Sequence, residues 1–220
     1  VLSGARISAD GATGGGTVHV GGGWKGEDET LANSQQTVVQ ANTQISANAT
    51  ANGNGGEVVV WADGHTAVDS EVQAKGGALG GNGGRVETSG KQSLAVNVAA
   101  NTSAAQGEAG QWLIDPANLT IVDQIPQGGF NLENSSQGPF FSTDDISSTF
   151  SPTESFLLNS TVVAGLENNG FVQIYTTGTQ PGDGNLTIAA PILIDQNSSQ
   201  STGFNPELFL EAKGEINIDA

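Results

Sequence analysis

A short motif recurs four times in the first half of the chain and restricts its fold more than any other feature. In each copy an apolar residue and a small pair lead through Gly- and Asn-rich residues to Gly-Gly (Ala-Gly in the last copy), one polar residue and a second apolar run. A period of about 20–50 residues is typical of stacked structural repeats. The copies begin at Ile7, Ile45, Val72 and Val98, and their second runs contain Val18, Val58, Val86 and Trp112.

Each period holds two or three short strands and no helical pattern, which predicts an all-β solenoid of the parallel β-helix type. Neighbouring strands then stack about 4.8 Å apart, and inward apolar residues form one continuous column. We expect Val18, Val58, Val86 and Trp112 to lie above one another, and the glycine pairs to supply corners with positive φ. A β-sandwich would also give short strands, but it does not predict one turn signature recurring in phase.

The composition changes near Asp115, where the glycine-dense part ends and the first of the seven prolines, Pro116, appears. We therefore divide the chain into regular β-helix repeats at 1–115 and a continuation of the same solenoid with irregular rungs at 116–220. Short apolar runs predict the strands of this second part, although they lose the phase of the first. These strands are Leu119–Val122, Phe171–Tyr175, Leu186–Ile188, Ile192–Ile194, Leu208–Leu210 and Ile216–Ile218.

Two insertions and one helix interrupt the strand pattern. The insertions are Trp24–Gln36 and the Gly-, Ser- and Phe-rich stretch 124–155, whose phenylalanines we expect to pack against the rod. Ser160 as N-cap and apolar residues at helical spacing predict a short helix near 161–168. Because loops on a rigid scaffold carry recognition, the two insertions are the expected contact sites for a partner.

The charge excludes several classes of partner. Six basic residues stand against 23 acidic ones, so the formal net charge is −17. Such a surface repels nucleic-acid backbones and anionic membranes, and we predict no nucleic-acid partner. No apolar run reaches the length of a membrane span. Without cysteine, disulfides and thiolate zinc sites are not available.

The residues that could carry chemistry are few and scattered. His19 alternates with two valines and is predicted to face solvent, and His65 follows Asp63-Gly64 in a predicted turn. The acidic runs Glu27–Glu29 and Asp144–Asp145, and the loop Asp183–Asn185, match no complete calcium-loop spacing. We therefore predict no catalytic, cofactor-binding or metal-binding residues, no cofactor, and no enzymatic activity. Calcium binding by the acidic loops stays open.

Potential acceptors for N-glycosylation, of the form Asn-x-Ser/Thr, occur seven times. In a chain rich in Asn, Ser and Thr several of these arise by chance. They are Asn48, Asn101, Asn118, Asn134, Asn159, Asn185 and Asn197.

Several blocks of the chain resemble filamentous-haemagglutinin-type exoproteins, the large passengers of bacterial two-partner secretion. The resemblance covers most of 1–122 and is looser beyond it. It is carried by structural glycines, valines and turn residues. The blocks are Gly21–Gly26 with Thr37–Val39, Gly55–Gly64, Gly83–Lys91, and Gln111–Pro116 with Asn118–Ile121.

This resemblance implies a right-handed parallel β-helix that is secreted, extracellular or attached to the bacterial outer membrane. The chain is similar to a shaft segment of such a protein rather than to its amino-terminal secretion domain. Export would use an outer-membrane pore recognised by a part outside this sequence. The expected function is a non-enzymatic adhesin shaft that presents polar ladders and loops to a host or neighbouring-cell receptor or glycan. The alternative is a polysaccharide-binding or polysaccharide-cleaving β-helix module.

Overall fold

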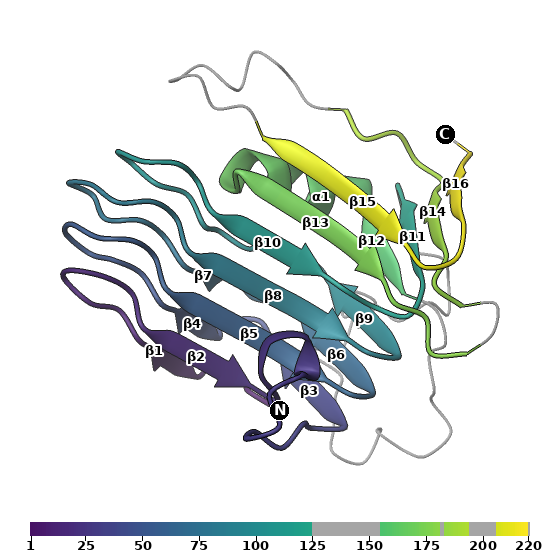
Figure 1. Cartoon of the computed structure of the whole chain (residues 1–220), viewed down its shortest axis with the longest axis horizontal. Helices are drawn as coiled ribbons and strands as arrows, with labels where there is room; N and C mark the ends of the chain where they lie inside the picture. The colour runs from purple at the N-terminus through teal and green to yellow at the C-terminus, as the bar shows by residue number, and fades with distance from the viewer. Residues whose placement is uncertain (125–154, 181–182, 194–205, 220) are drawn as a thin grey trace.

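The computed structural model describes residues 1–124, 155–180, 183–193 and 206–219, and within these residues the chain is mostly β-structure arranged in three sheets (Figure 1). All strand pairs inside the three sheets are parallel. The predicted all-β class with parallel strands is therefore confirmed. None of the helices in the described part is long and apolar enough to cross a membrane.

The strands are distributed over the sheets in a repeating order. Sheet I contains β1 (Arg6–Ser8), β4 (Gln44–Ser46) and β7 (Val72–Gln73). Sheet II contains, in spatial order, β2 (Thr17–Val20), β5 (Glu57–Ala62), β8 (Arg85–Gly90), β10 (Gln111–Ile114), β13 (Phe171–Thr176) and β15 (Glu207–Ala212). Sheet III contains β3 (Gln36–Val39), β6 (His65–Val68), β9 (Ser93–Val96), β12 (Phe156–Leu158), β11 (Leu119–Val122), β14 (Leu186–Ile188) and β16 (Ile216–Ile218).

The chain visits the sheets in rotation, and one pass from sheet I through sheet II to sheet III is called a circuit below. The first three circuits are β1-β2-β3, β4-β5-β6 and β7-β8-β9, and each lies beside the next along the stack (Figure 1). In the fourth, a bridge between Gln73 and Asn101 takes the place of a sheet I strand before β10 and β11. Two parallel neighbouring strands must be joined by a long connection, and a repeat of about 26–38 residues provides one between successive circuits.

The inward column of sheet II is confirmed residue by residue. Val18 pairs with Val58, Val58 with Val86, and Val86 with Trp112, and all four side chains are buried in one core. The column does not stop where the composition changes. Trp112 pairs with Val172, and Val172 with Leu208, so the strand register of this sheet continues past residue 115 although the sequence motif no longer recurs there.

Sheet I departs from the predicted repeat in its fourth copy. Ile7, Ile45 and Val72 are paired as the motif predicts. The pairing of Gln73 with Asn101 places Ala100, not Val98, beyond Val72. Ala100 is buried in the core, whereas Val98 is only partly buried. The last copy of the motif is therefore shifted by two residues from the column it was assigned to.

The paired glycines are needed for space and not for positive φ. Gly56, Gly84 and Gly110 all lack a positive φ, which corrects the prediction. A Cβ at Gly56 would overlap the carbonyl oxygen of Gly16 in the preceding circuit, and Gly84 and Gly110 face Gly56 and Gly84 in the same way. Each of the three also donates its N–H across the corner to the end of the sheet I segment, at 2.7–2.8 Å. Close backbone packing between circuits therefore fixes glycine at these positions.

Asparagine side chains join neighbouring circuits along the loops between sheets I and II. Asn48 Oδ1 accepts the Lys75 N–H at 2.8 Å, and Asn54 Oδ1 accepts the Asn82 N–H at 2.8 Å. Asn82 Oδ1 in turn accepts the Glu108 N–H at 3.0 Å. These bonds satisfy loop N–H groups that have no strand partner. Among the potential glycosylation sites, Asn48 is thus engaged inside the stack, and Asn134 and Asn197 lie outside the described residues.

The helix α1 (Asn159–Asn168) confirms the predicted short helix with different ends. Its N-cap is Leu158, which offers no side-chain bond, so the assignment of Ser160 as N-cap is wrong. Val162 and Leu166 enter the core, and a Cβ on Gly165 would lie 2.5 Å from Cζ3 of Trp112. The adjoining strand β12 inserts between β9 and β11 in sheet III.

The C-terminal end of α1 is fixed to the segment that replaces a strand in sheet I. Asn169 Oδ1 accepts the N–H and the hydroxyl of Thr102, at 3.1 and 2.7 Å. Asn169 Nδ2 donates to Ala100 O at 3.0 Å. The helix therefore covers the core where sheet I ends.

Two predicted features remain to be placed. Ile192 and Leu193 fall outside any strand, and residue 194 is outside the described residues, so the described part does not bear out the strand Ile192–Ile194. Nearly all of the second insertion, including Phe140, Phe141 and Phe150, also lies outside the described residues.

Replacing a corner glycine tests whether backbone contact between circuits is required. Gly56→Ala places a methyl group on the Gly16 carbonyl, and such overpacking typically lowers the free energy of unfolding by about 1–3 kcal/mol or more. Gly14→Ala is the matched control, because its Cβ would meet only Asn54 O at 3.7 Å. Urea unfolding followed by circular dichroism should show a lowered midpoint for Gly56→Ala alone. Equal midpoints for the two variants would contradict this account of the corners.

Candidate functional site

The outer face of sheet II carries ion pairs and cation–π contacts between charged and aromatic side chains. Inward residues alternate with outward ones along each strand, so Glu57, Arg85 and Gln111 form one outward row. Leu113 pairs with Glu87 in the next outward row, further along the strands. This face lies beneath the first insertion.

The first insertion forms a strap, defined here as residues 21–35, that leaves β2 and returns as β3 (Figure 1). Its apex is a short 3-10 turn, η1 (Trp24–Gly26), lying over β5 and β8. Gly26 packs so closely on the Trp61 ring that a Cβ there would overlap it. Lys25 has φ of 55°, a left-handed conformation that is unfavourable for a residue with a side chain.

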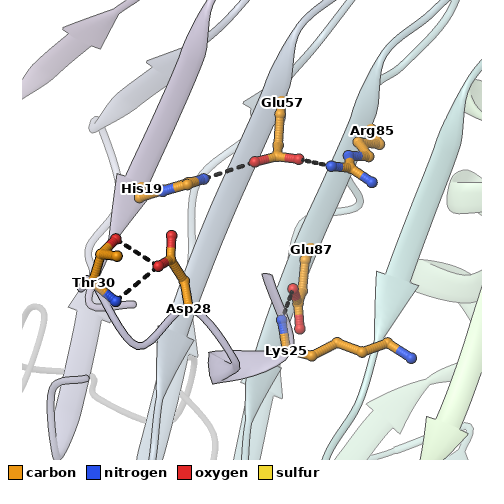
Figure 2. Close-up of polar contacts among 7 residues, drawn as sticks. All are labelled: His19, Lys25, Asp28, Thr30, Glu57, Arg85 and Glu87. Carbon is orange, nitrogen blue, oxygen red and sulfur yellow. Dashed lines mark hydrogen bonds and ion pairs between the residues drawn. The ribbon is translucent and has the colours of Figure 1, made fainter. Parts of the chain in front are cut away.

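Glu87 lies beneath the apex of the strap and is fully buried, although it points outward from β8. Its Oε2 accepts the backbone N–H of Lys25 at 2.7 Å, and its Oε1 has no partner (Figure 2). The Lys25 ammonium does not neutralise it, because that side chain runs away from the carboxylate (Figure 2). Burial raises the pKa of Glu87 to about 7, against the lowering effects of the Lys25 N–H bond, of the nearby Ser89 side chain and of the Lys25 charge.

A second buried carboxyl, Asp115, follows directly after β10. It is 3% exposed; its Oδ1 accepts the Thr177 hydroxyl at 3.1 Å, and its N–H donates to Ser89 Oγ at 3.1 Å. Burial raises the pKa of Asp115 to about 6. The charge of Asp115 contributes in turn to the raised pKa of Glu87. Two carboxyl groups with raised pKa values in one region are typical of functional sites as well as of structural networks.

Ion pairs and cation–π contacts form the rim of this face. Glu57 accepts from His19 Nε2 at 2.7 Å and pairs with Arg85 on its other oxygen (Figure 2). The Arg85 guanidinium lies 4.5 Å from the centre of the Trp24 ring, and Lys25 Nζ lies 5.1 Å from the centre of the Tyr175 ring. These contacts attach the first two residues of η1 to sheet II.

The two histidines lie in different sheets and do not meet. His19 is exposed on sheet II, as predicted, and pairs with Glu57. His65 is the first residue of β6 rather than a turn residue, which corrects the prediction, and its Nδ1 lies 2.7 Å from Ser93 Oγ. Burial lowers the pKa of His65. Ser93 is fully buried, so this Ser–His pair offers substrate no accessible hydroxyl.

The acidic loops use their carboxylates to stabilise their own turns. Asp28 Oδ1 accepts from the N–H and hydroxyl of Thr30 at 2.9 and 2.6 Å. Asp183 Oδ2 accepts the N–H of Gln180 at 3.0 Å, and its Oδ1 accepts from Asn118 at 3.2 Å. No group of three or more His, Asp or Glu residues suited to a metal ion occurs in the described part of the chain. Asp144 and Asp145 lie outside that part.

Comparison with known proteins gives no assignment. No protein-family model matches the chain, and no curated protein matches it significantly.

The sequence analysis did not identify Glu87 or Asp115. Glu87 alternates with inward residues in Arg85–Ser89 and has the pattern of a solvated outward side chain. Its burial comes from a strap about 60 residues earlier in the chain. The isolated position of Glu87 between strand-forming residues is the only local signal.

Removing the Glu87 carboxyl should change how stability depends on pH. The pKa is raised in the folded chain, so the stabilisation that Glu87 gives when protonated is fully present below about pH 4.5 and is lost as pH rises through about 7. Glu87→Gln should therefore exceed the wild type by about 3 kcal/mol at pH 8 and match it near pH 4.5, at roughly 1.4 kcal/mol per pKa unit. Urea unfolding at several pH values measures the difference.

Glu29→Gln provides the control, because it removes the same charge from an exposed position of the same strap. This variant should follow the wild-type curve at every pH. Parallel pH profiles for wild type and Glu87→Gln would contradict the assignment of Glu87 as a destabilising buried carboxylate.

Proposed function

We propose that this chain is a non-enzymatic shaft segment of a secreted or outer-membrane-attached bacterial exoprotein of the filamentous-haemagglutinin type, folded as a right-handed parallel β-helix. In this proposal residues 1–115 and 116–220 form one continuous rod. The observation that carries it is the in-register column from Val18 through Trp112 to Leu208. A stack of this kind extends by adding circuits.

The stacked architecture suits a mechanical role. Each circuit contacts mainly its neighbours, so stability grows with the number of circuits and the chain can fold progressively as it emerges outside a cell. The parallel ladders, the close corners and the asparagine links connect successive circuits along the stack. The net charge of −17 favours solubility and opposes lateral association of such rods.

Adhesion in this proposal depends on loops and outward rows rather than on a catalytic pocket. The partner is a host or neighbouring-cell receptor or a glycan. The strap and the second insertion are the proposed contact regions, because loops on a rigid scaffold carry recognition. Export uses the outer-membrane pore through a part of the protein outside this sequence.

One observation favours the alternative of a polysaccharide-cleaving module. Glu87 and Asp115 are two carboxyls on neighbouring strands, and glycoside hydrolysis uses one protonated and one ionised carboxyl. Both are buried, however, and Glu87 is covered by the backbone of Lys25. A substrate could reach Glu87 only if the strap moved.

A binding and turnover experiment separates these functions. We expect the chain to bind a subset of glycans on an array, or cultured host cells, and to release no reducing ends from neutral or acidic polysaccharides. The double variant Glu87→Gln/Asp115→Asn should bind as the wild type does, because both carboxyl groups are buried.

Polysaccharide cleavage that disappears in the double variant would overturn the shaft proposal and establish the enzymatic alternative. Failure of the wild type to bind any glycan or cell would contradict the adhesive part of the proposal.

A further inference from the structure

Cation–π contacts hold Trp24 and Lys25 of the strap on sheet II. Backbone bonds hold its C-terminal end, where Ser34 O accepts the Asp63 N–H at 2.8 Å and Gln35 O accepts the His65 N–H at 3.1 Å. The remaining contacts come from side chains. The Lys25 N–H bonds to Glu87, and Asn33 Nδ2 donates to Asp63 Oδ1 at 3.1 Å. Ser34 Oγ donates to the Trp61 carbonyl at 3.2 Å, and the Trp61 ring packs under Gly26. No strand pairing holds the strap, because η1 is the only regular element within it.

The contact at Glu87 is the one that depends on protonation. The ionised carboxylate is fully buried and accepts a bond from the strap only at Oε2, while Oε1 stays without a partner. Burial of an ionised carboxylate with an unsatisfied oxygen is unfavourable, and a neutral carboxyl reduces that penalty. Raising the strap restores water to the ionised group.

The charge of Lys25 lowers the pKa of Glu87, but burial outweighs this effect. The Lys25 ammonium lies over Tyr175 of β13, and the Arg85 guanidinium on the same strand pairs with Glu57. Asp115, beside β10, adds negative charge, and Glu27 of the strap adds further negative charge near Asp115. Of the other titratable groups near the strap, Glu29 is exposed, Asp63 pairs with Trp61 and Asn33, His19 with Glu57, and Asp28 with Thr30.

We infer that the strap is an acid-closed cover: it lies on sheet II while Glu87 is protonated and lifts when the Glu87 carboxyl loses its proton. The proton is released to solvent as the strap opens, and it is taken up again when the strap closes. Burial, which raises the pKa of Glu87 to about 7, places this transition between mildly acidic and neutral pH. Opening exposes Trp61 and Glu87 on the outer face of sheet II.

This inference goes beyond the proposed function and does not depend on it. An acid-closed strap changes which side chains the rod presents. In acid it hides Trp61 and Glu87, and above neutral pH it presents an aromatic ring beside the Glu87 carboxylate. The in-register column lies on the opposite side of the strands, so the core does not take part in the opening.

Amide hydrogen exchange tests this cover directly. The exchange of the Lys25 N–H, corrected for its intrinsic pH dependence, reports how often the strap opens. If the Glu87 pKa is near 4.5 in the open strap and about 7 in the closed one, opening should increase on the order of 50-fold between pH 5 and pH 8. Acrylamide quenching of tryptophan fluorescence should rise over the same range.

Two variants assign the effect to the Glu87 carboxyl. Glu87→Gln should lose most of the pH dependence and keep the strap closed at pH 8, and its circular dichroism verifies that it folds. His19→Gln removes an ionisable side chain of the same face that pairs with Glu57 and not with Glu87, and it should retain the wild-type dependence.

A pH-independent corrected exchange rate in the wild type would overturn the inference, and this measurement needs no variant. A full pH dependence retained in Glu87→Gln would overturn it as well. Amide exchange and acrylamide quenching do not depend on glycan or cell binding. Failure of this inference therefore leaves the shaft proposal untouched, and failure of the shaft proposal leaves this inference untouched.

Discussion

The structure depends on the burial of equivalent side chains directly above one another in successive circuits. Val18, Val58 and Val86 are paired residue for residue and sealed in one core with Trp112. Parallel stacking brings backbones within contact distance at every corner, and it is this proximity that excludes a side chain at Gly56 and Gly84. The same stacking does not require loops of one length. Val58 follows Val18 by 40 residues, whereas Trp112 follows Val86 by 26.

The sequence predicted the features that repeat and failed at features that occur once. The column of sheet II followed from a motif present four times, but Ala100 replaces Val98 because the last circuit enters sheet I through a single bridge. The helix was predictable from its spacing, but its start was not, because no side chain caps Leu158. The corner glycines were predicted correctly for a wrong reason, because the distance between circuits is a tertiary quantity.

The two buried carboxyls of the candidate site could not be predicted from the sequence, for a different physical reason. Alternation along β8 assigns Glu87 correctly to the outward face, and outward residues of a solenoid are normally solvated. Only the strap, which joins the site from a distant part of the sequence, turns this position into a buried one. The burial of Asp115 could not be predicted from neighbouring residues either, because its partners Ser89 and Thr177 come from other circuits.

A buried carboxylate without a neutralising cation lowers the stability of the folded chain, and an apolar residue of similar size at the same position would be more favourable. A basic residue capable of neutralising Glu87 is already present, but the left-handed backbone of Lys25 directs its ammonium towards Tyr175. The strap contacts outward side chains, whereas the inward column holds the circuits together. In the inferred acid-closed cover, the free energy of Glu87 ionisation therefore acts on the strap and leaves the stack intact, so a stack of parallel circuits can carry a surface that responds to pH.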